Sequence, residues 1–116
     1  MDKKVLEQKM SELMDLVPEC EGLIASDLSG NILVGQTITD MDHKLLAKEC
    51  LAIIKGSNAL GEKLGKGKLK TTTIDYENGF AVVSSSDEAI IIALAGLDGK
   101  ASLSLIKRNL IKISNL

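Results

Sequence analysis

Residues 88–96, Glu88-Ala-Ile-Ile-Ile-Ala-Leu-Ala-Gly96, form a short, unbroken apolar run between turn-like segments. The run is shorter than a typical buried helix and contains three consecutive β-branched isoleucines, so it predicts a β-strand. Because apolar residues occupy both alternating sets of positions, both faces of this strand need a cover. The chain is therefore predicted to be an α+β protein, a helix/sheet/helix sandwich with one packing layer on each side of the sheet.

Length and composition indicate a single globular domain over residues 1–116. A chain of this length buries roughly two-thirds of its unfolded surface, enough for a core without metal or disulfide cross-links. The net charge of −2, from 14 basic and 16 acidic side chains, argues against a general nucleic-acid binder. No apolar run approaches the ~20 residues of a membrane span, and no signal region follows the N-terminus. We expect a cytoplasmic protein with no membrane span.

Three helices are predicted from apolar residues at helical spacing. The first covers about residues 3–16 and ends before Pro18. The second is long, begins after Thr39 with Asp40 and Asp42 as caps, and ends in the glycine-rich segment 61–67. The closing helix follows Asp98-Gly99, and its apolar stripe consists of Leu103, Ile106, Leu110 and Ile113.

Five strands are predicted between these helices. Turn signals at Ser29-Gly30 and Asn78-Gly79 predict two hairpins, the first with Asp27 bonding the turn backbone. The order is helix, two strands, helix, three strands, helix (αββαβββα). The strands are predicted at residues 22–28, 31–37, 68–77, 79–86 and 88–96.

The second predicted helix is apolar over about half its circumference, more than one sheet contact requires. A helix of this kind usually meets two surfaces, so we expect it to pack against the sheet and also against a second copy of the chain. Flanking loops that cover the surplus are the alternative. The residues predicted for this dimer interface are Leu46, Cys50, Leu51, Ile53, Ile54 and Ser57.

The strand after this helix, 68–77, is polar, rich in threonine and preceded by lysines, a composition typical of a sheet edge. Two copies could pair along this edge into one continuous sheet while their second helices pack together. Leu69, Thr71 and Thr73 are the predicted interface residues of the strand. Alternatively, Lys66, Lys68 and Lys70 prevent such pairing.

The polar face of the second helix is the predicted partner-binding site. In a dimer its cations would form a basic ridge able to meet acidic residues of a partner. The ordinary interpretation is a hydrated helix face. The predicted residues are Lys44, Lys48 and Lys55, with His43 at the margin.

A search for catalytic, cofactor or metal motifs finds none, and we expect the protein not to be an enzyme. Residues 56–62 have phosphate-loop glycine spacing, but Glu62 stands where a lysine is needed. His43 and Cys50 lie seven residues apart on a helix, about 10 Å of rise, too far for a nucleophile–base pair. Cys20 and Cys50 are predicted to be unpaired, each a buried small hydrophobic residue.

With this element order, the chain resembles the Roadblock/dynein light-chain family over residues 1–114. The likeness is carried by Glu21-Gly-Leu-Ile-Ala-Ser-Asp-Leu-Ser-Gly-Asn-Ile-Leu-Val34, Gly79-Phe-Ala-Val-Val83 and Ile90-Ile-Ile-Ala-Leu-Ala95. It implies a five-stranded antiparallel sheet with the second helix on one face and the terminal helices on the other. It also implies a homodimer or heterodimer through the second helix and third strand. With no tail beyond the domain, we expect a minimal prokaryotic form, archaea included.

Proteins of this family are non-catalytic regulators and scaffolds, so the resemblance implies a Ras-like small GTPase as the partner. The single arginine, Arg108, is expected on the closing helix, away from the second helix, which argues against an arginine finger. The alternative is a small-ligand sensor of related topology. Its cavity would be lined by leucine, isoleucine and alanine, with Tyr76 and Phe80 as the only aromatics and few of the polar groups that ligand pockets use.

Overall fold

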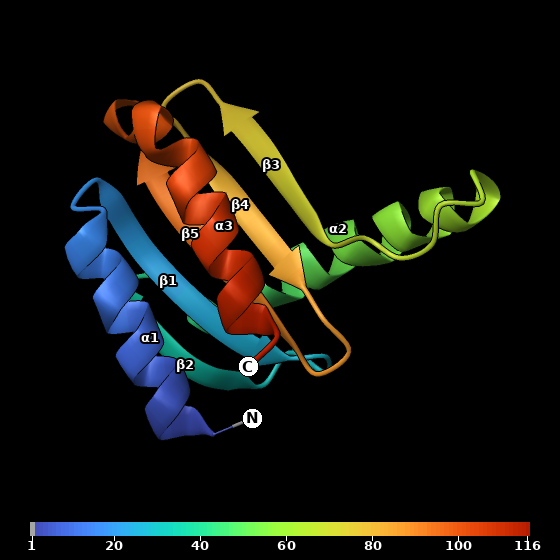
Figure 1. Ribbon diagram of the computed structural model, residues 1–116, viewed down its shortest axis with the longest axis horizontal. Helices are drawn as coiled ribbons and strands as arrows, with labels where there is room; N and C mark the ends of the chain where they lie inside the picture. Colours follow the sequence, from blue (N-terminus) through green and yellow to red (C-terminus); the bar gives the residue numbers. More distant parts are fainter. Residues whose placement is uncertain (1) are drawn as a thin grey trace.

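The computed structural model describes residues 2–116 and confirms the predicted helix/sheet/helix sandwich. One antiparallel sheet with strand order β2-β1-β5-β4-β3 lies between α2 on one face and α1 and α3 on the other (Figure 1). The elements are α1 (Lys3–Leu16), β1 (Cys20–Asp27), β2 (Ile32–Thr37), α2 (His43–Lys63), β3 (Thr71–Tyr76), β4 (Gly79–Ser85), β5 (Ala89–Gly96), a 3₁₀ turn (Leu97–Ser102) and α3 (Leu103–Ser114).

The apolar run is the central strand, β5, which pairs with β1 on one side and β4 on the other. Successive side chains of a strand point to opposite faces. Ile91 and Ala93 accordingly lie in the core beneath α1 and α3, whereas Ile90 and Ile92 lie in the core beneath α2. Both faces of the strand are thus covered, as its sequence predicts.

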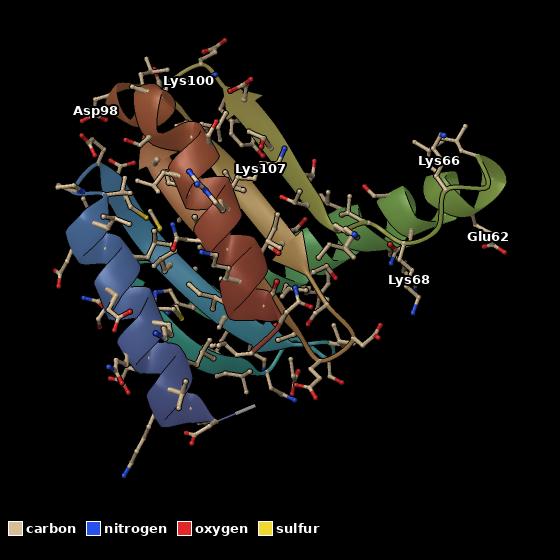
Figure 2. All side chains as sticks on the ribbon, in the orientation of Figure 1. Glu62, Lys66, Lys68, Asp98, Lys100 and Lys107 are labelled. Atoms are coloured by element: carbon tan, nitrogen blue, oxygen red, sulfur yellow. The ribbon has the colours of Figure 1, made fainter. Side chains whose placement is uncertain are left out.

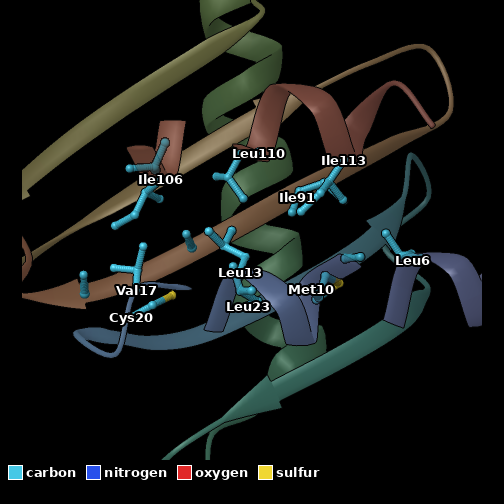
Figure 3. Close-up of a cluster of buried hydrophobic side chains, with 14 of the residues drawn as sticks. Leu6, Met10, Leu13, Val17, Cys20, Leu23, Ile91, Ile106, Leu110 and Ile113 are labelled. Atoms are coloured by element: carbon cyan, nitrogen blue, oxygen red, sulfur yellow. The ribbon is translucent and has the colours of Figure 1, made fainter. Parts of the chain in front are cut away.

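The two cores are unequal. The terminal helices bury a continuous row against the sheet, including Leu13 of α1 and Leu110 of α3 (Figure 3). On the other face, the 21-residue helix α2 buries only Ala47 and Ile54 completely. The α1/α3 layer therefore buries more apolar side chains against the sheet than α2 does.

The first hairpin turn has the predicted chemistry. The Asp27 carboxylate accepts hydrogen bonds from the backbone N–H groups of Ser29 and Asn31, each at 2.9 Å, and from the Asn31 side chain at 3.0 Å. The Asn31 side chain, followed by the backbone donors, holds the pKa of the Asp27 carboxyl below its usual range. Gly30 takes a φ of +90°, which the turn needs and glycine permits.

The second hairpin differs from the prediction by one residue. Tyr76 pairs directly with Gly79, so Glu77 and Asn78 form the turn, and Gly79 is the first residue of β4. A Cβ at position 79 would come within 2.4 Å of the Ala95 carbonyl oxygen. This glycine is therefore required by the close approach of β5 and by its φ of +158°, which other residues rarely adopt.

The start of α2 also differs from the prediction. Asp42 caps the helix, its carboxylate accepting from the Leu45 N–H at 3.1 Å, and the helix begins at His43. The Thr39-Asp40 pair lies in the preceding loop. Asp42 alone therefore has the capping role that was predicted for both carboxylates.

The segment between α2 and β3 turns back along the helix. The Lys66 N–H donates to the Gly61 carbonyl at 2.8 Å, and the Leu69 N–H donates to the Asn58 side chain at 2.7 Å. These bonds hold residues 64–70, the α2–β3 connector, against the last turns of α2. As a result β3 begins at Thr71 rather than at the predicted Lys68.

We predict opposite effects from the same substitution at two glycines of α2. Gly56→Ala should raise the free energy of unfolding by about 0.5–1 kcal/mol, because nothing lies within 4 Å of its Cβ and alanine favours helix. Gly61→Ala should lower it, because the new Cβ would lie 2.1 Å from the Gly67 carbonyl oxygen of the connector. Urea unfolding at one protein concentration measures both. Equal stabilisation by the two substitutions would contradict the connector packing.

Candidate protein-interaction site

The apolar side of α2 is largely uncovered in a single chain. Figure 1 shows the last turns of the helix extending beyond the sheet, past the start of β3. Leu60 and Leu64 in this projecting part are 58% and 59% exposed, and Ile53 is also exposed. Leu46, Cys50 and Ser57 are half-buried. The wide apolar arc seen in the sequence is thus exposed at Ile53, Leu60 and Leu64 and half-covered at Leu46, Cys50 and Ser57.

Not every predicted interface residue lies on this surface. Ile54 is 5% exposed and belongs to the core between α2 and the sheet, together with Ile24 and Ile92. Leu46, Cys50, Leu51 and Leu69 are half-buried, and all four pack in part against the same core. Ile53, Leu60 and Leu64 are exposed. We call these three residues, together with the half-buried Leu46, Cys50 and Ser57 beside them, the open arc of α2.

Strand β3 is an open edge of the sheet. Its ladder is with β4 alone, in a register that matches Thr71 with Ser84 and Thr73 with Val82. The lysines that precede it lie in the connector at the projecting end of α2, where Lys66 and Lys68 are labelled (Figure 2). The strand itself carries no lysine. Its outer backbone groups are thus not guarded by lysine side chains within the strand.

A hollow lies on the α2 side of the sheet, at the end of β3 farther from the connector. It has a volume of about 230 Å³ and is lined mainly by apolar side chains, including Met41, Tyr76, Ala81 and Leu94. Tyr76 is 60% exposed and Met41 is exposed as well. The open arc, the open edge and this hollow make one surface suited to a protein partner rather than to a small molecule.

The predicted partner-binding lysines lie along a flank of α2. Lys44 and Lys48 border a hollow shared with Ser29 and Gly30 of the β1–β2 turn. Lys48 and Lys55 border a second hollow shared with the β4–β5 turn, Ser85–Asp87. The lysines therefore face the hairpin turns.

His43 does not join them. Its ring packs over Gly35 of β2, and its Nε2 atom lies 3.0 Å from the Thr37 hydroxyl, so it is half-buried in a contact within the chain. His43, predicted at the margin of the basic face, is thus half-buried and hydrogen-bonded within the chain. Gly35 is the residue that sequence reasoning missed, because only glycine leaves room for the imidazole.

Metal-ligating side chains do not gather at one place among the described residues, 2–116. These residues contain no group of three or more His, Cys, Asp and Glu side chains that could hold a metal ion. Within the same residues, no helix is both long and apolar enough to cross a membrane. Both cysteines are free; Cys20 is buried as predicted, while Cys50 is half-buried on the open arc.

Comparison with known proteins identifies the fold. The family profile of the Roadblock/LC7 domain matches residues 6–95. Myxococcus xanthus MglB superposes with a TM-score of 0.83 at 12% identity, over 98% of this chain and 85% of that one. A Roadblock/LC7 domain from Streptomyces avermitilis gives 0.77 at 18% identity, over 90% of each chain. An MglB structure with a tetrameric arrangement gives 0.72 at 14% identity, over 95% of this chain and 90% of that one.

Such low identities show a shared fold and do not transfer an activity. A search of curated proteins finds no match to this chain. The family assignment therefore rests on the profile match and is consistent with the superpositions.

The environment of Cys50 should make the free energy of unfolding depend on pH in the alkaline range. Burial, followed by the Glu49 charge, raises the pKa of the Cys50 thiol from 9.0 to about 11. The neutral thiol is thus favoured in the folded state; this stabilisation is complete below pH 9 and is lost as the pH rises toward 11. We expect the free energy of unfolding to fall less between pH 9 and pH 11 in Cys50→Ala than in the wild type.

Urea unfolding at fixed protein concentration measures this difference. Cys20, whose thiol pKa burial also raises, is present in both proteins, so the comparison isolates Cys50. At neutral pH the variant should lose about 1–2 kcal/mol through a small cavity. The same alkaline slope in both proteins would refute the assignment.

Proposed function

Because this chain belongs to the Roadblock/LC7 family, we propose that it is a dimeric, non-catalytic regulator or scaffold of the cytoplasm that binds a Ras-like small GTPase. The observation that carries the proposal is the surface formed by the open arc of α2 and the open edge β3. A 21-residue helix with only two fully buried residues has an unfilled packing face. A second copy supplies both a helix for the arc and a strand for the edge.

The geometry of such a dimer follows from the two open elements. If two copies pair their β3 strands antiparallel about a two-fold axis, the start of one strand lies beside the end of the other. The last turns of α2 project past the start of β3 (Figure 1). In the second copy this position corresponds to the end of β3, beside Tyr76. Leu60 and Leu64 would then reach the apolar hollow there.

The same arrangement separates the lysines. With the open arcs facing each other, Lys44, Lys48 and Lys55 lie on the outer flanks of the paired helices. In this dimer the lysines form two separate basic flanks, one for each copy, and not the one ridge expected from the sequence. A GTPase could meet either flank with acidic residues, and charge complementarity would mainly raise the association rate.

The proposed action on a GTPase is conformational. The single arginine, Arg108, lies on α3, in the layer opposite α2. It cannot reach a GTPase bound at α2, so an arginine finger is not part of the proposal. Binding one switch conformation more tightly than another shifts the equilibrium between them without a catalytic group. The ligand-sensor alternative has no supporting observation, since Ile24, Val83, Ile90 and Ile92 fill the space between α2 and the sheet.

We predict that Leu60→Glu dissociates the dimer and leaves the fold intact. The side chain is 58% exposed in one chain, so the charge is hydrated in the monomer, but in the dimer it would be buried without a partner at a cost of several kcal/mol. Light scattering should give twice the chain mass for the wild type and the single mass for the variant, with unchanged circular dichroism.

Leu16→Glu is the matched control. Leu16 is 56% exposed on α1, in the other layer, and its substitution should leave the dimer unchanged. Ile54→Glu is a poor test, because Ile54 lies in the core of the single chain. A monomeric wild type, or a dimeric Leu60→Glu protein, would contradict the proposed interface.

We also predict that a small GTPase co-purifies with the tagged protein from its source cells, and does so more with a GTP analogue than with GDP. Lys44→Glu combined with Lys48→Glu should slow association several-fold at low salt, where charges steer the partner over the longest distance. At physiological salt the steering is screened beyond about 8 Å. The dimer and its melting temperature should be nearly unchanged because exposed charges add little stability. Stopped-flow mixing measures the rate.

The charge-matched control is Lys3→Glu with Lys107→Glu. Lys107 lies on α3 in the opposite layer (Figure 2). A GTPase that binds the Lys44/Lys48 variant at the wild-type rate would place the contact elsewhere. The proposed partner would be refuted if the tagged protein retained no GTPase in any nucleotide state.

A further inference from the structure

A groove runs between α2 and the turns of two hairpins. Its first part, of about 410 Å³, lies between the start of α2 and the β1–β2 turn at Ser29-Gly30. Its second part, of about 560 Å³, lies between the middle of α2 and the β4–β5 turn. Lys48 and Leu51 line both parts, so the two hollows adjoin along α2, and together we call them the turn-side groove.

The floor of the turn-side groove is apolar. Leu51 is half-buried there, and Ile54 closes the floor from the core side. Leu28, at the tip of the β1–β2 turn, is 47% exposed and contributes to the same lining. One or two apolar side chains of a partner can pack against this pair of an exposed and a half-buried leucine.

The walls of the groove are basic, although the chain as a whole is acidic. Four lysines border it, against two aspartates. Asp42 caps α2, and Asp87 pairs with Lys68 at 3.5 Å, so the excess positive charge comes from Lys44, Lys48 and Lys55. Local charge of one sign within a concave surface attracts the opposite charge. The four lysines are Lys44, Lys48, Lys55 and Lys68.

We infer that the turn-side groove binds a short, extended, acidic segment of another protein, anchored by one or two apolar side chains. From Asp42 to Asn58 the wall of α2 is about 24 Å long, which an extended segment of about seven residues would span. Such a segment places carboxylates beside the lysines and alternate apolar side chains on the floor. A flat anionic membrane could meet the lysines but not a floor that lies between α2 and the two turns.

The inference goes beyond the proposed function, because it concerns the chemistry of the segment and not the class of protein that carries it. In the proposed dimer the groove lies on the flank of α2 away from the second copy. Each copy therefore has its own groove, and a dimer should bind two segments.

The test uses a fluorescein-labelled peptide in which Leu and Phe alternate with Asp and Glu, added to the full-length protein in a fluorescence polarisation titration. We expect saturable binding that weakens as salt is raised. Lys48→Glu with Lys55→Glu should weaken it by about tenfold or more, equivalent to about 1.4 kcal/mol. Lys3→Glu with Lys107→Glu, which makes the same charge change on the other layer, should leave it unchanged.

The apolar floor is tested separately. Leu28→Ser, at an exposed turn position, should weaken binding several-fold, and so should replacement of Leu and Phe in the peptide by Ser. No binding of the original peptide, or equal binding by the Lys48/Lys55 variant, would overturn the inference. Binding that is indifferent to Leu28 and to the peptide anchors would show only charge attraction and would also overturn it.

Two further readouts separate the alternatives. Lysine-dependent sedimentation with phosphatidylserine vesicles, without peptide binding, would assign the lysines to a membrane and overturn the inference. Retention of a GTPase is measured independently, so peptide binding can fail while GTPase binding succeeds, and the reverse. Circular dichroism of each variant confirms that the fold is retained.

Discussion

The structure depends on covering β5 on both faces. A central strand with Ile90 and Ile92 on one face and Ile91 and Ala93 on the other cannot leave either face in water without losing about 25 cal/mol for each Å² of apolar surface. One face is covered by two helices and the other by one. Only part of the apolar face of α2 packs against the sheet. The rest of that face is the proposed interaction surface. Packing demand at the centre of the sheet thus sets where a partner can bind.

The fold was predictable where local chemistry and burial agree. The two-sided run at 88–96, the spacing of apolar residues in the helices and the Asp27 turn each carry their own signal, and the structure confirms them. The predictions were wrong where contacts distant in sequence decide the outcome. Gly79 was correctly placed at the start of a strand, but the turn was predicted one residue too late, and the close approach of Ala95 across the sheet could not be seen in the local sequence. Asp40 and Asp42 looked equally good as caps, and only the path of the chain into α2 separates them.

The sequence predicts that the candidate site lies on the second helix, but not which residues of that helix face the core and which face solvent. Helical periodicity placed Ile54 and Ile53 in one apolar stripe, yet the tilt of α2 over the sheet puts the first in the core and the second at the surface. The lysines were correctly placed on one stripe, but what faces that stripe depends on two hairpin turns far away in sequence. For the same reason His43 looked like a surface residue, because the space above Gly35 that receives its ring is a property of β2.

The α2–β3 connector has a consequence for dynamics. The Lys66 amide donates to the Gly61 carbonyl and the Leu69 amide to the Asn58 side chain, so the connector that leads into the edge strand is tied to the projecting end of α2. Hydrogen exchange at these two amides reports on a single opening unit, not on two independent ones. A partner that holds the helix end therefore also restrains the start of the strand edge through the connector, and the reverse.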